Sequence, residues 1–145
     1  MLPDYAKAEL QEALEMTSHN TGLNLVMALS YSSRWELVNA VKNIGLDVKN
    51  GKINPEEIDQ HTLQQYLTTS NFPDPELMIR TSGEYRISNF LLYQLAYAEL
   101  YFTNTRWPDF RKDNLYEAIL DFQNRERRFG KTGKQIKQEN TTAIS

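Results

Sequence analysis

Apolar positions follow two different spacings in the first part of the chain. Leu10, Ala13 and Leu14 lie on one face of a helix, which predicts a helix over residues 3–17. Residues 23–29, LNLVMAL, instead form a nearly unbroken apolar run of seven residues. A short run of this kind is typical of a strand that is buried on both faces in a parallel sheet.

Helical and strand-like spacings continue to alternate along the rest of the chain. Ser33 resembles an N-cap, with Glu36 three positions later in a capping-box pattern, and Asn50 and Gly51 are predicted to end the helix that follows. The same arguments predict three further helices, at residues 60–69, 89–97 (with Ser88 as the N-cap) and 113–128. They predict two further strands, at residues 76–80 and 101–103.

Strands that alternate with helices indicate an α/β fold, here part of a parallel sheet with flanking helices. A chain of 145 residues is long enough for one domain with a real core. Three strands are few for a closed α/β domain, so we expect this to be the later part of a larger sheet or a sheet that needs a partner. The domain is expected over residues 1–130, followed by a flexible tail over residues 131–145.

Composition narrows the class of protein. The chain has no cysteine, which excludes disulfides and thiolate chemistry and weakly favours a reducing compartment. No apolar run approaches the ~20 residues of a membrane span, and no signal peptide is recognisable, so the expected location is the cytoplasm. Residues 123–145 carry six Lys or Arg against two Asp or Glu. This basic end either attracts phosphate, a membrane surface or an acidic partner, or is a solvated helix end and tail.

The stretch RTSGEYRISN, residues 80–89, follows the predicted strand at 76–80 and therefore lies where parallel sheets bind ligands. Arginine offers paired donors that match phosphate oxygens, and glycine lets a backbone approach a ligand. The start of a helix adds unpaired N–H groups. These features predict an anion cradle for phosphate or diphosphate, made of Arg80, Thr81, Ser82, Gly83, Arg86 and Ser88. The alternative is a surface loop whose arginines pair with Glu84 and Glu76.

Glu99 is a carboxylate at the edge of an apolar region, where carboxylates are rare unless they are paired or bound to a metal. Beside a diphosphate it would suit a Mg²⁺ ligand. The alternative is an ion pair with Arg80, Arg86 or Arg106. His19 and His61 are too isolated in sequence to form a metal site. The aromatic residues lack interleaved Lys or Arg, which argues against nucleic-acid binding.

These residues resemble a known family. The stretches ELMIRTSGEYRISNFLLYQLAYAELYFT and WPDF closely resemble the C-terminal part of cis-prenyltransferases, with bacterial undecaprenyl diphosphate synthase as the nearest likeness. NTGLNLVMALSYSSRWELVNAV and NRERRFG extend the resemblance to about Gly130. The resemblance implies a Mg²⁺-dependent homodimer that condenses isopentenyl diphosphate onto an allylic diphosphate, usually farnesyl diphosphate. It also implies a product such as undecaprenyl diphosphate, the precursor of a cell-wall lipid carrier, and so peripheral membrane contact through that product.

The resemblance also assigns roles to residues of this chain. It implies that Arg80, Arg86 and Ser88 hold the diphosphate of isopentenyl diphosphate and that Glu99 helps to hold Mg²⁺. Arg128 and Gly130 match the family's C-terminal RxG pattern, which reaches the neighbouring subunit's site. The chain departs from the family because it lacks the DGNGRWA-like segment, which supplies the essential Mg²⁺-binding Asp, and the FSxEN-type motif. Two hypotheses follow: the C-terminal half of an enzyme, inactive alone, or a non-catalytic dimerisation or partner subunit.

Overall fold

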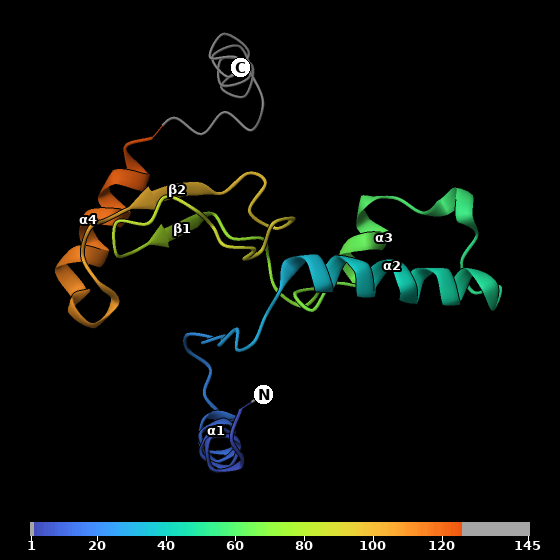
Figure 1. Cartoon of the computed structure of the whole chain (residues 1–145), viewed down its shortest axis with the longest axis horizontal. Coiled ribbons are helices and arrows are strands. Elements are labelled where there is room, and N and C mark those ends of the chain that lie inside the picture. The colour runs from blue at the N-terminus through green and yellow to red at the C-terminus, as the bar shows by residue number, and fades with distance from the viewer. Residues whose placement is uncertain (1, 126–145) are drawn as a thin grey trace, which may run out of the picture. The chain divides into compact units, whose positions relative to one another are not determined.

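The computed structural model describes residues 2–125 and confirms an α/β fold with a parallel sheet and flanking helices. The chain divides into two compact units, one up to Tyr31 and one from Ser32 onward. Its elements, shown in Figure 1, are α1 (Asp4–Thr17), α2 (Ser33–Lys49), η1 (Pro55–Glu57), α3 (Gln60–Gln65), β1 (Leu77–Arg80), β2 (Glu99–Phe102), η2 (Trp107–Asp109) and α4 (Lys112–Gln123).

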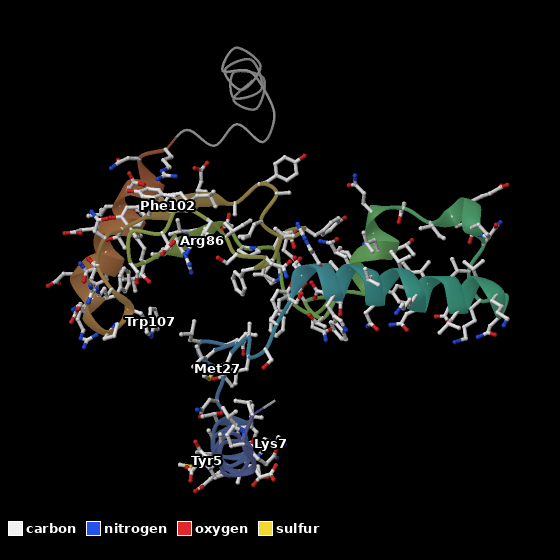
Figure 2. The ribbon with its side chains drawn as sticks, viewed as in Figure 1. Tyr5, Lys7, Met27, Arg86, Phe102 and Trp107 are labelled. Atoms are coloured by element: carbon white, nitrogen blue, oxygen red, sulfur yellow. The ribbon has the colours of Figure 1, made fainter. Side chains whose placement is uncertain are left out.

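The first unit contains the predicted helix but not the predicted strand. Helix α1 begins after Pro3 and ends at Thr17, as its apolar spacing predicted, yet none of its residues is buried. Residues 23–29 form no strand, because a strand exists only when its N–H and C=O groups are paired with a neighbour and the described chain offers this segment none. Its side chains are exposed, Leu23 to 93% and Leu25 to 80%. Figure 2 shows the labelled Tyr5, Lys7 and Met27 side chains of this unit projecting from the ribbon.

The second unit begins with α2, whose N-cap is Ser32 rather than the predicted Ser33. The Ser32 hydroxyl accepts a hydrogen bond from the Trp35 N–H, and Ser33 is buried as the first helical residue. At the other end, Asn50 is the C-cap and Gly51 has a φ of 72°, so the predicted end is confirmed. The next helix, α3, is shorter than predicted and ends at Gln65.

The sheet consists of β1 and β2, which lie side by side and parallel, with Leu77 opposite Glu99 and Arg80 opposite Phe102 (Figure 1). Helix α4 packs against β2, and α2 contacts α3. The small core of the described residues contains six buried apolar side chains: Ala40, Ile44, Leu67, Met78, Leu95 and Ala118. Two of the three predicted strands are therefore present in the described chain, and their parallel pairing is confirmed.

The predicted helix at residues 89–97 is wrong, since this segment is a series of turns. Ser88, Asn89 and Leu91 have φ values of 48°, 63° and 47°, which a right-handed helix cannot contain. Asn89 instead serves α2: its carbonyl oxygen accepts from the Ser33 N–H at 3.0 Å, and its side-chain oxygen accepts from the Arg34 N–H at 3.0 Å. The apolar spacing here therefore reflects packing of turns and not a helix.

Candidate functional site

Arg80 lies where the sequence predicted it, at the carboxyl end of β1, and its side chain is partly buried. Its Nε atom is buried and has no hydrogen-bond partner among the described residues. A buried N–H group without a partner is costly, so it indicates a position where a ligand oxygen would be accommodated. Arg80 is thus the strongest anion-binding candidate in the described chain.

The turn after Arg80 is fixed to the end of β2. The Ser82 N–H donates to the Thr105 carbonyl and the Gly83 N–H donates to the Thr103 carbonyl, each at 2.9 Å. Gly83 has a φ of 66°, and a Cβ at this position would lie 2.9 Å from the Asn104 side-chain oxygen. These two N–H groups therefore hold the turn in place and do not face a ligand, which leaves the side chains as donors.

Arg86 is exposed and forms an ion pair with Glu84, with Nη1 and Oε2 2.5 Å apart. The predicted alternative, pairing within the loop, is therefore present for Arg86. Figure 2 labels Arg86 and Phe102. The Phe102 ring packs against the ring of Tyr85, with the two centroids 5.2 Å apart. Exposed ion pairs contribute only ~0–1 kcal/mol, so an anion that bound Arg86 would displace Glu84 at little cost.

Ser88 is exposed and its hydroxyl makes no hydrogen bond within residues 2–125. Its neighbour Asn89 caps α2 and also donates to the Ser32 hydroxyl at 2.8 Å. Arg80, Arg86 and Ser88 thus lie at the end of β1 and on the connection from β1 to β2, beside the residue that caps α2. The helix predicted to begin after Ser88 does not form, so it cannot add unpaired N–H groups to the predicted anion cradle.

Glu99, the first residue of β2, forms the predicted kind of ion pair, but its partner is Arg125 and none of the three arginines that were predicted. Arg125 Nη1 donates to Glu99 Oε2 at 2.9 Å and to the Leu100 carbonyl at 3.0 Å. Its Nη2 lies 2.5 Å from Asp121. The hydrogen bond to Glu99, supported by Asp121, raises the pKa of Arg125 above its ordinary value. The sequence separation between Glu99 and Arg125 hides this pair, and only the packing of α4 on β2 reveals it.

Glu99 could bind Mg²⁺ only together with other ligands. Within residues 2–125, no group of three or more His, Cys, Asp or Glu could hold a metal ion. Mg²⁺ is usually held by one or two carboxylates together with substrate phosphates. Because Arg125 bonds only Oε2, the other carboxylate oxygen of Glu99 accepts no hydrogen bond in the described chain. Glu99 can therefore supply one oxygen ligand to a Mg²⁺ site that is completed by other groups.

A buried polar cluster surrounds Glu36, for which the sequence predicted a capping box instead. Glu36 is 1% exposed and does not complete a capping box. Its carboxylate accepts hydrogen bonds from the N–H and the hydroxyl of Thr68 and from Gln94, the last at 3.0 Å. The sequence held a usable signal, because Glu36 shares a helical face with the buried Ala40 and Ile44. This cluster ties α2 to the segment that follows Ser88.

Some predicted features lie elsewhere. Arg128 and Gly130 fall outside the described residues. His19 and His61 are both exposed. Among the helices of the described residues, none has the length and apolar character needed to cross a bilayer.

Comparison with known proteins identifies the family. The model of the family described as putative undecaprenyl diphosphate synthase matches residues 1–130. An isoprenyl transferase of Chlorobaculum tepidum is 54% identical over 137 residues, which cover 94% of this chain and 52% of the relative. One from Porphyromonas gingivalis is 50% identical over 135 residues, 93% of this chain and 53% of the relative. The chain thus spans about half the length of the curated relatives it matches.

Solved structures agree with this likeness. Lavandulyl diphosphate synthase from Lavandula x intermedia, in complex with dimethylallyl diphosphate, is similar with a TM-score of 0.84 at 37% identity, covering 90% of this chain and 56% of that one. A probable undecaprenyl diphosphate synthase from Campylobacter jejuni has a TM-score of 0.70 at 34% identity, covering 90% of this chain and 58% of its own. These matches show that the chain belongs to the cis-prenyltransferases, the family of undecaprenyl diphosphate synthase.

Proposed function

We propose that this chain forms the isopentenyl-diphosphate half of a cis-prenyltransferase active site. Arg80, Arg86 and Ser88 bind the diphosphate of isopentenyl diphosphate. The enzyme adds this unit to an allylic diphosphate such as farnesyl diphosphate and makes a polyprenyl diphosphate such as undecaprenyl diphosphate. The observation that carries the proposal is the Arg80 side chain at the end of β1, whose buried Nε has no partner among the described residues.

The chemistry suits these residues because it needs orientation and charge stabilisation rather than a nucleophilic side chain. The allylic C–O bond breaks, a C–C bond forms to the isopentenyl double bond, and a proton leaves the isopentenyl unit. Arginines that grip one diphosphate hold the double bond in line with the allylic carbon. Their positive charge also stabilises negative charge that builds nearby as the other diphosphate departs.

Glu99 is proposed as one ligand of Mg²⁺. When bound, Mg²⁺ supplies electrostatic stabilisation of diphosphate oxygens. The carboxylate contributes one oxygen, while Arg125 keeps the other occupied by a hydrogen bond at 2.9 Å. The likeness of the chain to isoprenyl transferases supports this assignment.

The whole enzyme is proposed to be a cytoplasmic homodimer in which this chain is one part of each subunit. The matched relatives extend over roughly twice the length covered here, since the chain covers 52% and 53% of two of them. The remaining length is proposed to supply the allylic diphosphate site and the essential Asp. Arg128 and Gly130 are proposed to reach the neighbouring subunit's site. The 145-residue chain alone is therefore expected not to turn over.

The experiment is incorporation of labelled isopentenyl diphosphate onto farnesyl diphosphate with Mg²⁺. It compares the 145-residue chain with the product of its complete reading frame. In the active form, Arg80→Ala is expected to lower kcat/KM for isopentenyl diphosphate about 10- to 100-fold, the value of a charge-assisted hydrogen bond or two. Arg111→Ala, at the exposed start of α4, is the matched control. Unchanged turnover in the Arg80 variant would overturn the site.

A second candidate function is a non-catalytic partner subunit. It is favoured by one observation: Arg86 and Glu99 already have charged partners within the chain, Glu84 and Arg125. A scaffold would need no free groups there. This alternative predicts a stable dimer that binds no isopentenyl diphosphate in equilibrium dialysis, with or without the complete reading frame.

A further inference from the structure

Arg125 occupies a position between two carboxylates. It directly follows the last turn of α4, where its own backbone N–H donates to the Phe122 carbonyl at 3.2 Å. One nitrogen, Nη2, lies 2.5 Å from Asp121 on the same helix. The other, Nη1, donates both to the Glu99 carboxylate and to the Leu100 carbonyl. The guanidinium group therefore bridges α4 to the first two residues of β2.

This geometry restricts Glu99 more than a simple ion pair would. The Glu99 and Arg125 side chains are 29% and 31% exposed, so solvent screens the pair only in part. The shared Nη1 donor fixes the carboxylate relative to the β2 backbone, because Leu100 is part of the same strand. One carboxylate oxygen is held, and the other is left for a ligand. A hydrogen bond of this kind is what orients carboxylates that bind metal ions.

Charge also distinguishes this cluster from a closed salt bridge. Two carboxylates, Glu99 and Asp121, surround one guanidinium, which leaves one net negative charge. Asp121 offsets the positive charge of Arg125, so the arginine can hold Glu99 without cancelling its attraction for a cation.

We propose that Arg125, held in place by Asp121, is the positioning residue that prepares Glu99 to bind Mg²⁺ together with the diphosphate. This inference rests on the proposed role of Glu99. It assigns functions to Asp121 in α4 and to Arg125 just beyond its end, both of which lie in the helix predicted at residues 113–128. Arg125 touches neither substrate nor metal and acts through Glu99.

The test measures binding without turnover. The dissociation constant of isopentenyl diphosphate is determined by calorimetry with and without Mg²⁺, in the absence of any allylic substrate, on the protein expressed from its complete reading frame. The dissociation constant without Mg²⁺ divided by the constant with Mg²⁺, called the Mg²⁺ ratio, reports the coupling between metal and diphosphate. Wild type is expected to show a ratio well above one. Glu99→Gln is expected to bring the ratio close to one.

Arg125→Gln and Arg125→Lys are both expected to reduce the Mg²⁺ ratio about tenfold, the usual effect of removing a hydrogen-bond partner of a metal ligand. Lysine retains the charge but not the planar fork that serves Glu99, Leu100 and Asp121 together. Asp121→Asn, a milder change that guards against misfolding, is expected to reduce the ratio severalfold. Arg111→Gln at the far end of α4 is the matched control and is expected to leave the ratio unchanged.

The outcomes separate the two proposals. If Glu99→Gln keeps the wild-type ratio, the metal role of Glu99 fails, and the role of Arg125 fails with it. If Glu99→Gln loses the ratio while both Arg125 variants keep it, only the positioning role is overturned. A higher ratio in Arg125→Gln would also overturn it, since the arginine would then compete with the metal. A lower melting temperature with an unchanged ratio would show that Arg125 serves the fold alone.

Discussion

Residues 23–29 and strand β1 are both short apolar runs, and their surroundings differ. In β1, Met78 is 9% exposed and the backbone pairs with β2 along Leu77–Arg80. In residues 23–29, Leu23 is 93% exposed and no strand partner exists within the described chain. The difference teaches that an apolar run specifies a capacity for sheet formation, while the sheet itself depends on a neighbour that supplies hydrogen bonds.

The largest test of this comparison introduces the same charge into both runs. In the 145-residue chain, Met78→Asp is expected to lower the free energy of unfolding by about 3 kcal/mol or more, because it buries an unpaired charge. Val26→Asp, at a position that is 59% exposed, is expected to change it by less than about 0.5 kcal/mol. Urea denaturation followed by circular dichroism measures both.

The same pair of variants tests the prediction that this sheet is the later part of a larger one. Expressed from the complete reading frame, Val26→Asp is expected to become as damaging as Met78→Asp, since residues 23–29 would then be a buried strand. Equal and small effects of Val26→Asp in both forms would contradict this and would leave residues 23–29 as a surface segment.

Next in size is the buried carboxylate of the second unit. Glu36→Ala leaves the Thr68 N–H without its acceptor and removes one of the two acceptors of the Gln94 amide, so it is expected to cost about 2–3 kcal/mol. Glu12→Ala, on the fully unburied α1, is the matched control and is expected to stay within about 0.5 kcal/mol. A neutral result for Glu36→Ala in the same denaturation experiment would mean that the cluster does not fasten α2 to residues 88–94.

A third and smaller effect concerns glycines in the two regions. Gly83→Ala forces an alanine into a φ of 66° and is expected to cost about 1–2 kcal/mol; the nearby Asn104 oxygen adds little because it ends a flexible side chain. Gly22, in the first unit, has open space around it and no positive φ. Gly22→Ala is therefore expected to be neutral or slightly stabilising, by at most about 1 kcal/mol. Thermal unfolding distinguishes the two, and equal shifts would contradict the turn geometry.

These contrasts show what the sequence could predict. Spacing of apolar residues located α1, α2, β1 and β2, because local periodicity and caps act over a few residues. It wrongly predicted a helix at residues 89–97, because Asn89 caps α2 and has a positive φ. The position of Arg80 at the end of a strand could be predicted because a strand end is a local feature. Arg125 was missed because its partner Glu99 belongs to a different element, and such contacts follow from packing and not from pattern.

The smallest expected effect is on pH dependence within the second unit. Hydrogen bonds from Lys52 and Tyr66, the latter at 2.6 Å, hold the pKa of Asp47 below its ordinary value of 3.8. A lowered pKa stabilises the folded chain above that value, so this contribution is lost as pH falls below about 4. The same bond raises the pKa of Tyr66 above 10.0, so its contribution is present below pH 10 and is lost as pH rises beyond that. Tyr66→Phe is expected to reduce the alkaline and the acid dependence of the unfolding free energy on pH. Asp47→Asn is expected to remove the contribution of this pair at both ends, while Asp59, whose pKa is also lowered, still contributes at the acid end. An unchanged alkaline slope in Tyr66→Phe would show that the bond between α2 and Tyr66 does not contribute to stability.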